Sequence, residues 1–315
     1  MSNVKIPYLI LGPIAALSLT AVLTSLTNPA YCSTVLSGWD SKGEQTIILT
    51  GDVMLGRSVN SRLTRTRDYA WPFEYIQAEL QEADLTYINL ESPLIASCPV
   101  TESGMRLCGH SNNVQSLLAA GVDIASLANN HALDYGQVGL KDTIDTLVSN
   151  NIDPIGVGNI VVKDVDGTKV AFVSFNDVGN LPGIDNALPS IMSDRLSDAT
   201  SQADFVIATF HWGREYEANP TSRQVDLARQ AIDLGADLVV GAHPHWIQSK
   251  DTYKGVPIYY SLGNTIFDQE WSEQTKTGLV LKVYIQDSSI KKIDELVLYS
   301  SNYGQPRWVT SETKE

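Results

Sequence analysis

Short apolar runs separated by amphipathic stretches recur along the chain from residue 46 onward. The runs have the length of buried strands and lie at 46–50, 85–89, 124–127, 170–175, 205–210, 238–240 and 258–262. Apolar residues three and four apart predict helices at 73–82, 114–120, 138–148 and 225–234. Alternating strands and helices are typical of βαβ units with parallel strands. The pattern therefore predicts an α/β domain.

Two places depart from this alternation. Asp166 and Gly167 form a turn signal between apolar residues 160–162 and 170–175, which predicts a β-hairpin. Further along, residues 279–285 and 293–298 alternate like an antiparallel pair of strands. We therefore expect mixed sheets rather than purely parallel ones.

The N-terminal region has a different pattern, because residues 6–39 contain no charged side chain. Residues 6–26 are apolar over a length that can span a bilayer. Lys5 precedes them, which favours a single-pass membrane anchor with the rest of the chain outside the cytoplasm. A cleaved signal peptide, followed by secretion, is the alternative, although residues 28–30 match a cleavage site weakly.

The domain organisation follows from these patterns. We expect a signal or anchor segment at 1–32, a spacer at 33–45, one domain at 46–300 and a tail at 301–315. A formal charge of −14 argues against a nucleic-acid partner, since such proteins need a basic surface. Arg62, Arg65 and Arg67 form the one basic cluster, which is typical of a solvated helix or loop face.

The cysteines agree with export. Cys98 and Cys108 bracket a short loop, and an oxidising compartment would let them form a disulfide. Two free thiols are the alternative, and Cys32 has no evident partner.

Polar side chains of metal-ligand type follow five of the apolar runs. They are Asp52, Glu91, Asn129, Asn130, His131, His211, His243 and His245. Singly, each fits a plainer role, such as a helix cap for Asp52 or a turn for the asparagines. An α/β sheet, however, gathers the carboxyl ends of its strands along one edge. Four of the five histidines fall in these clusters, so the set predicts a divalent metal site.

The same residues belong to motifs that resemble a known family over about residues 46–298. The motifs are Gly51-Asp52-Val53-Met54-Leu55-Gly56-Arg57, Asn89-Leu90-Glu91-Ser92-Pro93, the stretch 126–136 around Asn129-Asn130-His131, His211-Trp212-Gly213, Gly241-Ala242-His243-Pro244-His245 and Tyr260-Ser261-Leu262-Gly263-Asn264. They resemble the CapA-type bacterial capsule-synthesis family, which is itself similar to the calcineurin-like metallophosphoesterases.

This resemblance implies a fold and a set of roles. The fold is a four-layer α/β/β/α sandwich of two mixed sheets. The cofactor is one or two divalent ions, manganese, iron or zinc, and His131 takes the place of the catalytic histidine. The implied metal ligands are Asp52, Glu91, Asn130, His211, His243 and His245. The residues we assign to substrate binding are Arg57, Asn129, Glu215 and Asn264.

One departure from the phosphoesterase pattern affects the expected number of ions. Met54 stands where those enzymes have a histidine, and Glu91 stands where they have an aspartate. A thioether is a poor ligand for hard or borderline divalent ions. We therefore expect one well-held ion and a second, weaker one.

The resulting functional hypothesis is metal-activated hydrolysis of a phosphoester during synthesis of poly-γ-glutamate capsule or another cell-envelope polymer. Two alternatives stay open. The protein is a non-catalytic assembly or anchoring component with a structural metal, or it catalyses metal-assisted hydrolysis or transfer at amide bonds of a glutamate polymer. The partners expected are the membrane, other capsule-synthesis proteins and an anionic polymer.

Overall fold

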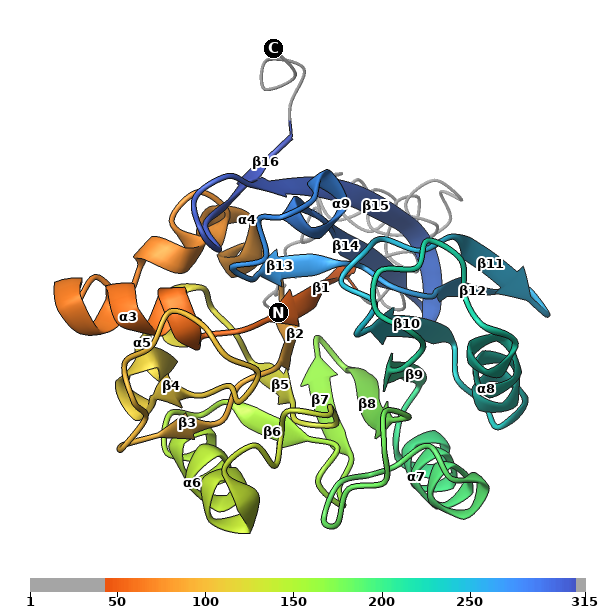
Figure 1. Cartoon of the computed structure of the whole chain (residues 1–315). Helices are drawn as coiled ribbons and strands as arrows, with labels where there is room; N and C mark the ends of the chain where they lie inside the picture. The colour runs from red at the N-terminus through yellow and green to blue at the C-terminus, as the bar shows by residue number, and fades with distance from the viewer. Residues whose placement is uncertain (1–42, 310–315) are drawn as a thin grey trace, which may run out of the picture. The chain divides into compact units, whose positions relative to one another are not determined.

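The computed structural model describes residues 43–309, which form two large mixed sheets with helices packed against them (Figure 1). The first sheet contains β1 (Gln45–Val53), β2 (Leu85–Leu90), β5 (Ile124–Ser126), β6 (Asp153–Ile155), β13 (Asn264–Ile266), β14 (Thr277–Gln286), β15 (Ser289–Ser300) and β16 (Pro306–Trp308). Its order is β16-β15-β14-β1-β2-β5-β6, and β13 also pairs with β1. Strands β1, β2, β5 and β6 are parallel, whereas β14 to β16 are antiparallel.

The second sheet has six strands in the order β11-β12-β10-β9-β8-β7. They are β7 (Val161–Val165), β8 (Thr168–Asn176), β9 (Phe205–His211), β10 (Leu238–Ala242), β11 (Lys250–Tyr253) and β12 (Val256–Tyr259). The four central strands are parallel, and an antiparallel strand closes each edge. A small third sheet pairs β3 (Leu94–Ile95) with β4 (Gly109–His110).

The helices divide between the outer faces of the two large sheets. Those on the side of the first sheet are α3 (Arg57–Thr66), α4 (Gln77–Gln81), α5 (Val114–Ala119) and α6 (Gly136–Val148), with short 3-10 turns η1 (Trp71–Phe73) and η2 (Ser111–Asn113). Those on the second sheet are α7 (Pro189–Gln202) and α8 (Ser222–Asp233), whereas α9 (Glu273–Lys276) precedes β14.

Three apolar cores separate these layers. Along β1, Ile47 and Leu49 join the core between the sheets, where they pack with Phe172 of β8, whereas Ile48 joins the core beneath the helices of the first sheet. This alternation follows from the two-residue period of a strand. A third core lies between the second sheet and its helices, which include Met192 of α7. The order of layers is therefore helix, sheet, sheet, helix.

The structure confirms most of the predicted elements. The hairpin joins β7 to β8, with positive φ at Asp166 (48°) and Gly167 (79°), and β14 pairs with β15 as expected. The helix predicted at 73–82 is wrong in extent, because only η1 and the short α4 form there. Helices α3 and α7 were not predicted, since their polar sequences leave few apolar positions.

Two predictions concern the ends of the chain, a membrane segment and a C-terminal tail. The membrane segment expected at 6–26 lies outside the described residues. Within 43–309, none of the helices has the length and apolar character needed to cross a membrane. Residues 306–308, in the segment expected to be a tail, form β16 and pair with β15.

Candidate metal centre

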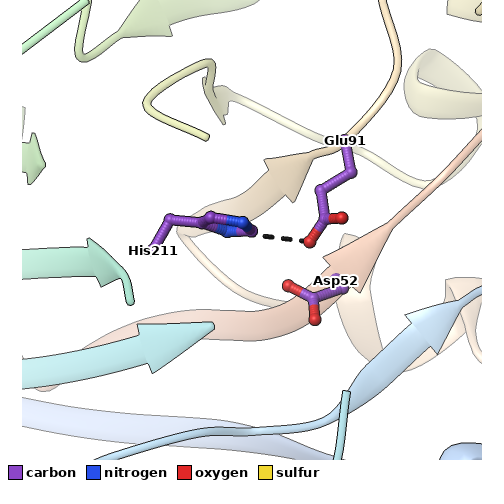
Figure 2. A group of neighbouring side chains, drawn as sticks. All are labelled: Asp52, Glu91 and His211. Atoms are coloured by element: carbon purple, nitrogen blue, oxygen red, sulfur yellow. Dashed lines mark ion pairs between the residues drawn. The ribbon is translucent and has the colours of Figure 1, made fainter. Parts of the chain in front are cut away.

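The carboxyl ends of β1 and β2 in the first sheet meet those of β9 and β10 in the second. Asp52 lies near the end of β1, Glu91 directly follows β2 and His211 ends β9. One ligand atom from each lies within 4.8 Å of the others, and all three residues are buried. Figure 2 shows the three side chains facing one another, with the contact between His211 and Glu91 drawn as a dashed line. The first sheet thus supplies carboxylates and the second supplies an imidazole.

Glycines shortly before Asp52 and His243 let the backbone pack closely against neighbouring segments. A Cβ atom at Gly51 would lie 2.0 Å from the carbonyl oxygen of Gly263, and one at Gly241 would lie 2.1 Å from the carbonyl oxygen of Tyr260. Both distances are too short for a side chain. The Gly-Asp and Gly-Ala-His sequences therefore reflect tight packing that brings Asp52 and His243 to the site.

Asp52 accepts hydrogen bonds from several neighbours. The backbone N–H of His243 lies 3.3 Å from both carboxylate oxygens, and Nδ1 of His245 lies 3.0 Å from Oδ2. Burial alone would raise the pKa of Asp52, but the hydrogen bond with His245 holds it below its usual range. Asp52 is therefore an ionised carboxylate that ties the two sheets together.

The pKa of Glu91 is shifted in the opposite direction from that of Asp52. Burial, together with the negative charge of Asp52, raises the pKa of Glu91 well above its usual value. Its Oε1 lies 3.7 Å from Nδ1 of His211, whereas Oε2 has no hydrogen-bond partner among the described residues. Nδ1 of the buried His243 also has none. Buried polar atoms of native proteins are rarely unpaired. Both atoms therefore fit a site in which they bind a cation.

The neighbours of two imidazoles indicate their tautomers. Nδ1 of His245 lies within 3.0 Å of Asp52 Oδ2 and 2.9 Å of Asn264 Oδ1, which are both acceptors. Nδ1 therefore carries the proton, which leaves the lone pair on Nε2. Nε2 of His211 lies 2.8 Å from Oδ1 of Asn130, so the lone pair of that ring is on Nδ1. Each ring thus presents one nitrogen that can bind a cation.

Burial favours the neutral form of the imidazoles of His211 and His243. It lowers the pKa of His211 well below its usual value, and the neighbouring His243 adds to this effect. The pKa of His243 is lowered to about 4 by burial and by His245. The rings of His211 and His243 lie 4.6 Å apart between centroids. Neutral imidazoles are the form that binds metal ions.

The backbone of the His243-Pro244-His245 turn has unusual geometry. His243 has φ +95° and His245 has φ +57°, both on the left-handed side where side chains are disfavoured. Each such position costs about 1–3 kcal/mol and persists only where surrounding contacts impose it. This turn presents both imidazoles at the end of β10.

His131 lies beside the cluster and has its own partner. Its Nδ1 is 2.9 Å from Oδ2 of Asp134, and its backbone N–H donates to Oδ1 of Asn129 at 3.1 Å. The carboxylate orients the ring with the proton on Nδ1, which leaves Nε2 for exchange of a proton. The charge of His131 influences the pKa of both His211 and His243.

The residues assigned to substrate binding lie around the cluster and mostly contact other protein groups. Arg57 pairs with Asp268, and Asn264 holds His245 through Oδ1. Asn129 donates from Nδ2 to the carbonyl oxygen of Leu90 at 2.9 Å and to Asn89 at 3.2 Å. Glu215 is half-buried, and its charge acts on Glu91. Asn129 and Asn264 are thus used to position other site residues.

Sequence reasoning missed the central position of Asn89. Its Nδ2 lies 2.9 Å from Asp52 Oδ1, 3.1 Å from Glu91 Oε1 and 3.2 Å from His211 Nδ1. Asn129 donates to Oδ1 of Asn89, which directs Nδ2 toward these three atoms. The signal was present, because an asparagine inside an otherwise apolar strand requires buried hydrogen-bond partners.

Two other predicted features have clear positions. Met54 is buried against Leu107 and Phe267, so its side chain lies in an apolar cluster. Cys98 and Cys108 are joined in a disulfide, with sulfur atoms 2.01 Å apart. The disulfide closes the loop between β3 and β4.

Taken together, the donor set suits a divalent ion. Carboxylate oxygens and neutral imidazole nitrogens are ligands for zinc, iron and manganese. Oε2 of Glu91 and Nδ1 of His243, both without a partner in the described part of the chain, fit the same interpretation. The fold and these residues define an α/β sandwich with a buried cluster of metal-ligand type at the carboxyl ends of its strands.

Comparison with known proteins identifies the family. The family model described as "Bacterial capsule synthesis protein PGA_cap" matches residues 46–269, so the chain belongs to this family of bacterial capsule synthesis proteins. It is 33% identical over 290 residues to the capsule biosynthesis protein CapA of Bacillus anthracis, and the aligned region covers 84% of this chain and 70% of that protein. It is 34% identical over 248 residues to the PGA biosynthesis protein CapA of Bacillus subtilis (strain 168), covering 73% of this chain and 65% of that protein.

A relative in Mycobacterium tuberculosis, named as a probable polyglutamine synthesis accessory protein, is 28% identical over 254 residues and covers 70% of this chain and 66% of that protein. Among solved structures, a hypothetical protein from Thermus thermophilus is similar with a TM-score of 0.55 and 18% sequence identity, covering 82% of this chain and 100% of that one. At this identity the likeness shows the fold alone.

Proposed function

We propose that this protein acts in the synthesis of capsule poly-glutamate, as a metal-dependent hydrolase that uses activated water on a phosphoester. The role in capsule synthesis is supported by the family and by the names of its relatives. The observation that carries the chemistry is the buried convergence of Asp52, Glu91 and His211 within 4.8 Å. Oε2 of Glu91 and Nδ1 of His243, which have no hydrogen-bond partner within residues 43–309, support it.

The roles of the residues follow from their contacts. A bound divalent ion would lower the pKa of a water molecule and polarise a phosphoryl oxygen. Asp52, Glu91, Asn130, His211, His243 and His245 would hold such ions. His131, oriented by Asp134, would deliver a proton to the leaving group from Nε2. Arg57, held by Asp268, would contribute positive charge beside Glu91.

The proposal includes export and membrane anchoring by the N-terminal segment. The uncharged residues 6–39 support it, as does the disulfide between Cys98 and Cys108, which is typical of an oxidising compartment. The protein would then work at the outer face of the membrane together with other capsule-synthesis proteins.

A non-catalytic assembly component with a structural metal is the second candidate. Two observations favour it. Met54 is buried in an apolar cluster and offers no ligand for a hard ion. The amide of Asn89 donates toward three candidate ligand atoms and thereby partly replaces a cation.

The test uses the full chain, stripped with a chelator and then supplied with manganese, iron or zinc. Bound metal is measured by elemental analysis, and hydrolysis is assayed on phosphomonoesters, phosphodiesters and poly-γ-glutamate. We expect His131→Ala to keep its metal but lose phosphoester turnover, whereas His110→Ala, at the one histidine outside the cluster, keeps both. Metal binding without turnover would favour the assembly role, and cleavage of poly-γ-glutamate itself would favour amide chemistry. Absence of bound metal would contradict both metal-dependent interpretations.

A further inference from the structure

A groove lined by arginines lies beside α3, outside the candidate metal centre. Its volume is about 340 Å³, within the range of small-molecule sites. We call it the arginine groove; the lining residues that matter here are Ser58, Arg62, Arg65, Trp71, Glu102 and Tyr303. They come from α3, from η1, from the disulfide-closed loop and from the turn between β15 and β16. The groove thus contains two arginines and one glutamate, although the chain as a whole has a formal net charge of −14.

Arg62 is oriented but incompletely paired. Its guanidinium carbon lies 4.3 Å from the centre of the Trp71 ring, and its Nε has no hydrogen-bond partner among residues 43–309. Trp71 is itself fixed, because Gln305 donates to its carbonyl oxygen at 2.9 Å. Stacking on an aromatic ring fixes the plane of the guanidinium, and its N–H groups match the two oxygens of a carboxylate.

The groove already contains a carboxylate from the protein itself. Oε1 of Glu102 accepts a hydrogen bond from the Ser61 hydroxyl at 3.0 Å and lies 3.6 Å from the guanidinium of Arg65. The side chains of Arg65 and Glu102 are 66% and 62% exposed. Ion pairs this exposed contribute little to stability, so another carboxylate can displace Glu102 at small cost.

The groove adjoins the candidate metal centre through Ser58. The backbone N–H of Ser58 donates to Oδ2 of Asp268 at 3.1 Å, and the same carboxylate pairs with Arg57. The charge of Arg57 in turn acts on Glu91. Ser58 and Asp268 thus connect one side of the groove to Arg57.

We propose that the arginine groove binds carboxylates of a glutamyl chain and that Glu102 competes with them as an internal carboxylate. The carboxylate chemistry comes from the groove, whereas the glutamyl identity rests on the proposed function. Arg62, held by the buried Trp71, and Arg65 bind successive carboxylates, and the exposed ring of Tyr303 lies beside the methylene groups between them. An anion can approach this negatively charged protein only where local cations outweigh its overall charge.

The test measures binding of a fluorescent γ-linked glutamate decamer to the full chain by anisotropy, in chelator and at fixed ionic strength. We expect Arg65→Gln and Arg62→Gln each to weaken binding about tenfold, the effect of losing one charge-assisted hydrogen-bonded pair. Glu102→Gln should instead tighten binding about threefold, because the internal competitor is lost. Arg67→Gln is the matched control at the end of the same helix, outside the groove, and should change binding less than about twofold.

Equal weakening by Arg67→Gln would overturn the proposal, since it would show a nonspecific effect of charge. Weaker or unchanged binding by Glu102→Gln would also overturn it, as would displacement of the decamer by inorganic phosphate at the same concentration of charge. Arg65 is largely exposed, so its variant tests the groove even if Arg62→Gln is poorly folded. Because metal is absent, this result is independent of hydrolysis, and either proposal can fail alone.

Discussion

The two ends of the strands use aspartate in different ways. At the amino ends, Asp84, Asp123, Asp204 and Asp237 each directly precede a strand and accept a backbone N–H from the neighbouring strand, at 2.7, 2.8, 3.0 and 2.8 Å. At the carboxyl ends, Asp52 accepts from the side chains of Asn89 and His245 as well as from backbone. The first arrangement closes the sheet with local partners, whereas the second brings together residues that are distant in sequence.

The comparison separates stability from chemistry. The amino-end aspartates bond mainly to main chain, so they stabilise neighbouring strands. The carboxyl-end cluster leaves Oε2 of Glu91 and Nδ1 of His243 without hydrogen-bond partners among the described residues. A group of buried, partly unpaired side chains is costly, and such groups are typical of functional sites.

The largest effect is expected for Asp52→Ala. The substitution removes the acceptor of the His243 N–H. It also removes one of the acceptors of the Asn89 amide and one of the two acceptors of Nδ1 of His245. We expect the free energy of unfolding to fall by about 3 kcal/mol, as when a buried charged pair loses one member. Urea denaturation measures this change, with Asp52→Asn as the control that keeps an acceptor. A loss as small as that of Asp237→Ala would show that the two ends of the strands are equivalent.

His243→Ala should affect the metal-bound protein more than the metal-free one. Its Nδ1 has no partner among residues 43–309, so the stability in chelator should change little. The stabilisation by added manganese or zinc, about 2.7 kcal/mol at a hundredfold excess over Kd, should be lost. Thermal denaturation with and without metal measures both quantities. Full metal-dependent stabilisation in the variant, with His110→Ala as the control, would exclude His243 as a ligand.

Asn89→Asp should change the stability in opposite directions with and without metal. In chelator, a third carboxylate beside Asp52 and Glu91 replaces a hydrogen-bond donor, and we expect a loss of about 2 kcal/mol. With metal, the added carboxylate should increase the number of ions bound or their affinity. Calorimetric titration and denaturation measure the two effects. Asn112→Asp, at an exposed position, is the control, and equal behaviour of the two variants would contradict a central role for Asn89.

The smallest effects are expected at the amino ends. Asp237→Ala removes the acceptor of the Val206 N–H and should cost about 1 kcal/mol, whereas Asp237→Asn keeps an acceptor. Burial raises the pKa of Asp237 above 3.8, so the folded state favours the protonated form. The stability of the wild type should therefore fall relative to Asp237→Asn as the pH rises from about 4. Denaturation at several pH values between about 4 and 7 measures the difference, and the opposite trend would contradict the direction of this pKa shift.

Predictability from the sequence also differed between regions. Most strands of both sheets could be predicted because short apolar runs have few other ways to be buried. Strands β6, β11, β13 and β16 were not predicted, since each has only three or four residues. Helix α3 could not be predicted. It packs through Val59 and Leu63, and polar residues such as Arg62 and Arg65 interrupt the apolar pattern. Arg62 buries its stem and stacks on Trp71, a contact that depends on residues outside the helix.

The candidate site was predictable in composition but not in geometry. The strand-end positions of Asp52, Glu91 and His211 follow from the alternation of apolar runs and polar clusters. The sequence could not show that Asn89 directs its amide toward all three, or that Asn129 fixes that orientation. Nor could it show that Glu102 lies in the arginine groove.

By itself, the sequence determined most strands and helices of this protein and the edge at which its polar residues gather, because burial of apolar side chains acts through local periodicity, whereas the four layers were implied by the family resemblance. Only the tertiary structure decided which polar atoms meet, which imidazole nitrogen is free and which buried atoms have no partner. Hydrogen bonds and charges act over a few ångströms, whereas some of the residues they join, such as Asn89 and His211, lie 122 positions apart in the chain.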